Sequence, residues 1–94
     1  MELDELRRQI DAVDRKLVEL LNERARLVEV VGKLKKRLGM EIYIPERERE
    51  ILDLAAAANG GPFSGAAISR LFERILDESR SLERKIADDA GGKV

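Results

Sequence analysis

The sequence contains no cysteine and no histidine among its 94 residues. Disulfide bonds, the usual zinc-ligand sets, nucleophile pairs built on Cys or His, and imidazole acid–base chemistry are therefore excluded. These absences exclude most hydrolase mechanisms. We expect a function that needs no metal and no cofactor.

Aromatic residues are also scarce, at 3%, whereas charged residues make up 39% of the chain. This composition favours solvated amphipathic helices over strands, which are rich in β-branched and aromatic residues. The predicted fold class is all-α. Because the formal net charge is only −1, nothing in the overall charge favours binding to nucleic acid or to an anionic membrane.

Long apolar runs are missing too, and the first residues, Met-Glu-Leu-Asp-Glu, lack the basic region of a secretory signal. We therefore expect a cytoplasmic location. The length fits a single domain, predicted over residues 1–88. Residues 89–94 lack periodicity and are expected to be a flexible tail or a linker remnant.

Apolar residues recur at alternating steps of three and four through the first part of the chain, which predicts one very long helix from about residue 3 to 38. They are Leu3, Leu6, Ile10, Val13, Leu17, Leu20, Leu27, Val31, Leu34 and Leu38. Such a helix is ~54 Å long, whereas a compact chain of this size has a radius of gyration of ~12 Å. A second copy can cover the protruding apolar stripe, so we expect an intertwined homodimer.

Two shorter helices are predicted after a stop at Gly39. Pro45 suits the first turn of the second helix, which should end near Ala58. The sequence Asn-Gly-Gly-Pro at 59–62 is a strong break, and Ser64 is a candidate N-cap for the third helix. This gives three helices per chain.

Arg24 occupies the position in the first helix where the apolar pattern skips a residue. A guanidinium on an apolar stripe needs an anion, although it could also pair with a Glu of the protein or extend to solvent. Lys35 is eleven residues further, about 20° from the same face and ~16 Å along the axis. The two cations could bracket one elongated anion. Arg7 could join them only from the other chain of an antiparallel dimer, and otherwise is a solvated arginine.

Four further polar residues are candidates for the same site. Arg47 and Glu48 lie in the first turn of the second helix, although alternating Glu and Arg usually form a solvated face. Ser79 and Glu83 fall on or beside the apolar stripe of the third helix, although Ser79 could bond back to a carbonyl and Glu83 could face water. Together they indicate a helix-lined pocket for a dianion.

Five segments, in their order and spacing, resemble the all-helical class of chorismate mutases over about residues 3–86. They are Leu-Arg-Arg-Gln-Ile-Asp-Ala-Val-Asp at 6–14, Leu-Leu-Asn-Glu-Arg at 20–24, Val-Gly-Lys-Leu-Lys at 31–35, Pro-Glu-Arg-Glu-Arg-Glu at 45–50, and Gly-Pro-Phe followed by Ile-Ser-Arg-Leu-Phe at 68–72. The resemblance implies an intertwined dimer with two equivalent sites. It also implies the Claisen rearrangement of chorismate to prephenate in phenylalanine and tyrosine biosynthesis.

The resemblance also implies a role for each candidate. Arg24 and the other subunit's Arg7 would grip the two carboxylates of chorismate, which Ser79 would also contact. Lys35 would donate to the ether oxygen, Glu48 would hold the ring hydroxyl, and Arg47 would support the charge network.

Two positions depart from the family pattern. Ile44 stands where many relatives have Asp, which removes an N-cap but keeps the backbone N–H. Glu83 stands where many bacterial relatives have Gln, so it must be protonated to donate to the ether oxygen.

Two alternatives remain open at this stage. An isochorismate-pyruvate lyase has the same fold and a similar site, but the lyases have an apolar residue where Glu48 stands. A non-catalytic helical module for dimerisation or chorismate sensing, attached to a larger enzyme, is the other.

Overall fold

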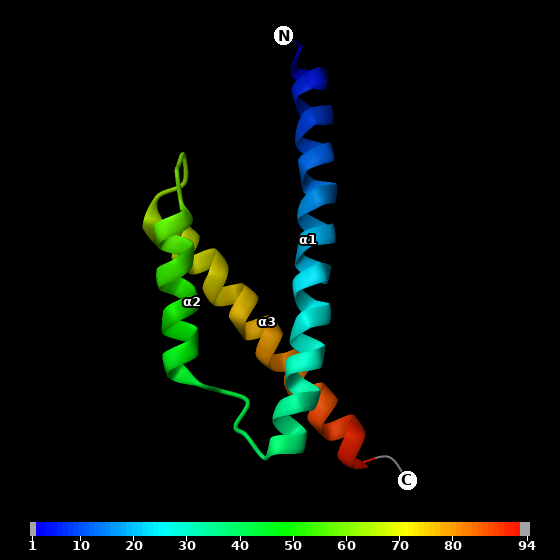
Figure 1. Ribbon diagram of the computed structural model, residues 1–94. Coiled ribbons are helices and arrows are strands. Elements are labelled where there is room, and N and C mark those ends of the chain that lie inside the picture. Colours follow the sequence, from blue (N-terminus) through cyan, green and yellow to red (C-terminus); the bar gives the residue numbers. More distant parts are fainter. Residues whose placement is uncertain (1, 93–94) are drawn as a thin grey trace.

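The computed structural model describes residues 2–92, and the side-chain environments of residues 2–89. Three helices make up the fold: α1 (Leu3–Leu38), α2 (Pro45–Ala58) and α3 (Gly65–Gly92) (Figure 1). Residues 2–92 include no strand. The all-α class, the three helices and the very long first helix are confirmed.

Local signals set most of the helix ends. Gly39 ends α1 in the left-handed conformation (φ 69°), which glycine adopts without a Cβ penalty. Pro45 occupies the first turn of α2 after Ile44, whose side chain makes no capping hydrogen bond. The Ser64 Oγ accepts a hydrogen bond from the Ala67 N–H at 3.1 Å and caps α3, as predicted.

The end of α3 differs from the sequence-based expectation of a tail without regular structure. The helix continues without a break past residue 88 to Gly92. Alanines at positions 87 and 90 favour helix, so nothing local stops it at 88. The division into a domain and a tail stays a prediction, and residues 93–94 lie outside the described part.

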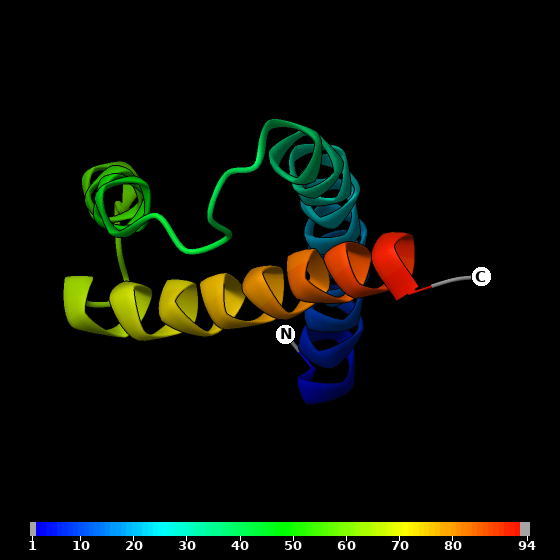
Figure 2. The ribbon, with the colours of Figure 1, turned by 90° about the horizontal axis from the view of Figure 1, so that it is seen from below.

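The third helix packs against both of the others, whereas among the described residues no Cα atom of α1 comes within 8 Å of a Cα atom of α2. Seen from below, α3 crosses between α1 at one end and α2 at the other (Figure 2). The N-terminal half of α1 extends well beyond this junction (Figure 1). The chain is accordingly elongated, with extents of 57 × 30 × 15 Å and a radius of gyration of 16.8 Å.

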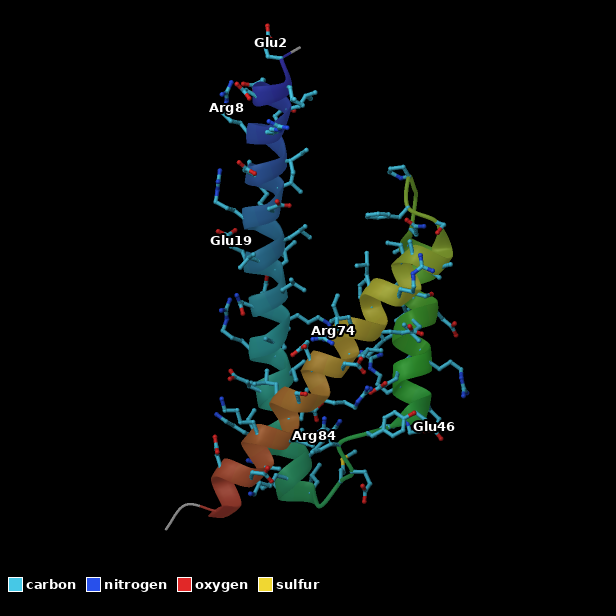
Figure 3. All side chains as sticks on the ribbon, turned by 180° about the vertical axis from the view of Figure 1, so that it is seen from behind. Glu2, Arg8, Glu19, Glu46, Arg74 and Arg84 are labelled. Atoms are coloured by element: carbon cyan, nitrogen blue, oxygen red, sulfur yellow. The ribbon has the colours of Figure 1, made fainter. Side chains whose placement is uncertain are left out.

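The single chain has almost no apolar core. Among residues 2–89, Leu76 is the only buried large apolar side chain. All ten apolar residues of the predicted stripe on α1 are between 42% and 64% exposed. Side chains between the labelled Glu2 and Glu19 reach no other element (Figure 3). No helix of the described chain is long and apolar enough to cross a membrane.

Candidate functional site

A pocket of about 180 Å³ lies where the C-terminal half of α1, the start of α2 and the middle of α3 meet. It contains most of the residues that the sequence analysis selected. Seven of the eight line it: Arg24, Lys35, Ile44, Arg47, Glu48, Ser79 and Glu83. Long-range packing thus brings together, from three helices, residues that the sequence analysis expected to share one pocket.

Arg24 is directed toward α3 and not outward into solvent. Its Nη1 donates a hydrogen bond to the Ser79 Oγ at 2.7 Å. The Ser79 hydroxyl in turn donates to the Ile75 carbonyl oxygen at 2.8 Å. Ser79 therefore makes the local backbone bond and also fixes the Arg24 guanidinium, and no carboxylate pairs with Arg24 within residues 2–89.

Lys35 and Glu83 form an ion pair across the α1–α3 interface. The Lys35 Nζ lies 2.9 Å from the Glu83 Oε1, and the two side chains are only 14% and 9% exposed. The contact is an ion pair, and within the described residues Oε1 accepts no hydrogen bond. Lys35 also donates to the Ile42 carbonyl oxygen at 2.8 Å. The ammonium is held between α3 and the α1–α2 connection.

Gly32 allows the close helix approach behind this pair. It is the only buried residue of α1, and a Cβ built on it would lie 3.4 Å from the Glu83 Cγ and 3.6 Å from the Ile86 Cδ1. These are ordinary van der Waals distances for a methyl group. A larger side chain would displace α3, and Glu83 with it.

Arg80 is the one charged residue lining this pocket, within the described part of the chain, that the sequence analysis did not select. Its guanidinium contacts the carboxylates of Glu48 on α2 and of Asp77 on α3, and lies 5.4 Å from the Tyr43 ring centroid. The hydrogen bond that Arg80 donates to the Glu48 carboxylate raises the pKa of Arg80 above its ordinary value. A sequence signal existed, because residues 76, 80 and 83 are spaced for one face of a helix.

Arg47 and Ile44 also line the pocket, but the polar contacts they make stay within α2 and its N-cap residue. The Arg47 Nη1 pairs with Glu50 at 2.6 Å, and both side chains are more than half exposed. The Ile44 carbonyl oxygen accepts from the N–H groups of Arg47 and Glu48, each at 3.1 Å. The roles that the resemblance implies for these two residues stay predictions.

Arg7 is the one candidate that does not line the pocket. It is exposed on the free half of α1, seventeen residues before Arg24 and therefore ~25 Å away along the helix axis. Within one chain it cannot reach a ligand that contacts Arg24. No group of three or more acidic side chains among the described residues could hold a metal ion.

Comparison with known proteins gives a consistent result. The family model described as "Chorismate mutase type II" matches residues 6–84. A chorismate mutase from Methanocaldococcus jannaschii is 30% identical over 95 residues, covering 97% of this chain and 93% of that protein. A bifunctional chorismate mutase/prephenate dehydratase from Aquifex aeolicus is 40% identical, covering 90% of this chain but 25% of that protein.

Solved structures agree with the sequence comparison. The structure of chorismate mutase (form II) from Thermus thermophilus superposes with a TM-score of 0.85 at 41% identity, covering 87% of this chain and 93% of that chain. This chain spans about a quarter of the length of the bifunctional relatives. The family match covers most of the chain, and the chain belongs to the chorismate mutase type II family.

Proposed function

We propose that this chain catalyses the rearrangement of chorismate to prephenate. One observation carries the proposal: Arg24 and Lys35, two cations on one face of α1, are held in a single pocket by Ser79 and Glu83 of α3. A dianion of elongated shape matches two fixed cations separated along a helix axis. The family and its relatives supply the identity of that dianion.

The reaction is unimolecular: a C–O bond breaks, a C–C bond forms, and no nucleophile or base takes part. The protein therefore contributes by holding the flexible enolpyruvyl ether in the compact conformation that reacts. Arg24 binds a carboxylate, with Ser79 fixing the guanidinium. Lys35 stands beside the ether oxygen, which gains negative charge as the C–O bond breaks.

Glu83 has a further requirement in this scheme. It faces Lys35 as an ion pair, and an ionised carboxylate accepts hydrogen bonds but cannot donate one. Glu83 can therefore donate to the ether oxygen, together with Lys35, only in its protonated form. Glu48 accepts from the ring hydroxyl on the opposite side of the pocket, and Arg47 adds positive charge there.

We further propose that the working unit is a homodimer in which the partner subunit's Arg7 completes each site. The exposed apolar stripe on α1 supports this, because packing the stripe against α1 of a second copy would remove both stripes from water and stabilise the dimer. The pocket of one chain is also smaller than the ~300–1,000 Å³ usual for small-molecule sites. Exposed Arg7, on the free half of α1, is positioned to enter another chain's pocket in an antiparallel arrangement.

The same activity fits a free-standing enzyme and a domain of a larger one. The Methanocaldococcus relative is nearly the same length as this chain, whereas the Aquifex relative is about four times as long and is named as a bifunctional chorismate mutase/prephenate dehydratase. In either case the proposal places the product in phenylalanine and tyrosine biosynthesis. The cytoplasmic location stays a prediction.

The test is direct. The purified chain is mixed with chorismate, its loss is followed in the ultraviolet, and the product is identified by chromatography and mass spectrometry. We expect prephenate from the parent and a rate lower by orders of magnitude from Arg24→Ala. Release of pyruvate from isochorismate, with chorismate unchanged, would make the chain a lyase. No reaction with either compound would leave only a binding or dimerisation role and overturn the proposal.

A further inference from the structure

The Arg80 side chain is fixed on three sides by different parts of the fold. Glu48 comes from the first turn of α2, Asp77 from one turn earlier on α3, and the Tyr43 ring from the α1–α2 connection. The Arg80 and Glu48 side chains are only 23% and 20% exposed. Three partners that converge on one partly buried guanidinium leave it little freedom to rotate.

Glu48 depends on Arg80 for its orientation. Within residues 2–89, Arg80 is the only side chain that hydrogen-bonds to Glu48, and the bond involves Oε1. Arg47, the adjacent arginine in α2, pairs with Glu50 at the surface instead. The second oxygen of Glu48, Oε2, is left without a protein partner in the same part of the chain, and Glu48 lines the pocket.

Charge balance also requires a cation at this position. Glu48 is an acidic side chain in a pocket that we propose binds a dianion, and an uncompensated carboxylate there would repel the ligand. Arg80 neutralises it without occupying both of its oxygens. A lysine would supply the charge but not the planar fork that contacts Glu48 and Asp77 together.

We infer that Arg80 is a positioning residue: it orients the Glu48 carboxylate so that Oε2 accepts a hydrogen bond from the ring hydroxyl of the substrate. This inference rests on the proposed function and adds to it a residue that determines specificity. Arg80 acts through Glu48 and does not itself touch the reacting atoms. Its effect is therefore tied to the hydroxyl group of the ligand.

The experiment compares the parent, Arg80→Met, Arg80→Lys, Glu48→Gln and the double variant Arg80→Met/Glu48→Gln. Arg74→Met is the matched control, because Arg74 lies on the same helix and pairs with Glu78 in an exposed contact. Each protein is checked for helicity and melting temperature. It is then assayed with chorismate and with an analogue whose ring hydroxyl is replaced by hydrogen.

We expect Arg80→Met to lower kcat/KM for chorismate by about 10- to 100-fold, as misplacing a contact group does. Most of this loss should appear as a raised KM, and Arg80→Lys should recover part of it. The analogue without the hydroxyl should react equally well with the parent and Arg80→Met. In the Glu48→Gln background, the Arg80→Met substitution should add little.

Several outcomes would overturn the inference. If Arg80→Met matched the parent on chorismate while Arg24→Ala remained impaired, the proposed function would stand and Arg80 would have no positioning role. If Arg80→Met lost equal factors of kcat/KM on chorismate and on the analogue, Arg80 would have only a general structural role. The same would follow if the double variant lost the product of the two factors lost by Arg80→Met and Glu48→Gln alone. If Arg80→Met unfolds, Arg80→Lys makes the same comparison. A parent inactive toward chorismate would refute the proposed function itself, and this inference with it.

Discussion

Replacing Lys35 by alanine tests the ion pair at the centre of the site. The change removes the ammonium 2.9 Å from Glu83 and leaves that carboxylate, with a side chain only 9% exposed, without a cation. It also removes the hydrogen bond to the Ile42 carbonyl oxygen. Stability and activity should therefore fall together, for separable reasons.

The size of the stability loss follows from burial. Breaking a fully buried pair costs ~3–5 kcal/mol, and leaving one buried polar group unsatisfied costs ~1–3 kcal/mol. Because both side chains retain some exposure, we expect Lys35→Ala to lose about 2–3 kcal/mol. For a domain of this size that corresponds to a melting temperature lower by roughly 10–20 °C. Loss of the donor beside the ether oxygen should lower kcat by about 10²–10³-fold.

A second substitution separates the two effects. The double variant Lys35→Ala/Glu83→Gln no longer contains an uncompensated carboxylate, so most of the lost melting temperature should return while activity stays low. Thermal unfolding by circular dichroism, at one fixed protein concentration, measures the first effect, and the ultraviolet assay measures the second. A Lys35→Ala chain as stable as the parent, or a double variant no more stable than Lys35→Ala, would refute this reasoning.

Further substitutions give independent checks. Gly32→Ala should keep its activity and gain up to ~1 kcal/mol of helix stability, because the added methyl group makes ordinary van der Waals contacts. Gly32→Leu should lose activity, because the larger side chain displaces Glu83. Equal activity of the two variants would refute the argument that Gly32 permits the close approach of α1 and α3. Ile44→Asp should raise the melting temperature by supplying an N-cap worth about 1 kcal/mol, and an unchanged melting temperature would show that α2 gains nothing from a cap.

The helices were predictable because their ends are encoded locally. Gly39, Pro45 and Ser64 each act through their own backbone or the next few residues, and the structure places the helix ends there. The end of α3 was harder, because the apolar period ends by residue 88, whereas the glycine pair that can stop a helix comes only at 91–92, where α3 ends. Absence of a pattern does not by itself end a helix that has already formed.

Site residues were predictable only in part. Arg24 and Lys35 stood out because they interrupt or flank an apolar stripe, and the pocket contains both. Arg80 did not stand out, because its partner Glu48 lies thirty-two residues earlier on another helix. Pairing of that kind depends on how α2 and α3 pack, which periodicity within one helix does not determine.

Mixed dimers test the central claim, a site built from two chains, most directly. Arg7→Ala and Arg24→Ala chains are prepared separately, mixed, and allowed to exchange subunits, with exchange verified by native mass spectrometry. Each mixed dimer should regain one intact site, made of Arg24 from one chain and Arg7 from the other. The mixture should then recover about a quarter of the parent's activity from two nearly inactive proteins, as random pairing in a twofold dimer requires. A mixture that exchanges fully and stays as inactive as its components would contradict the shared site.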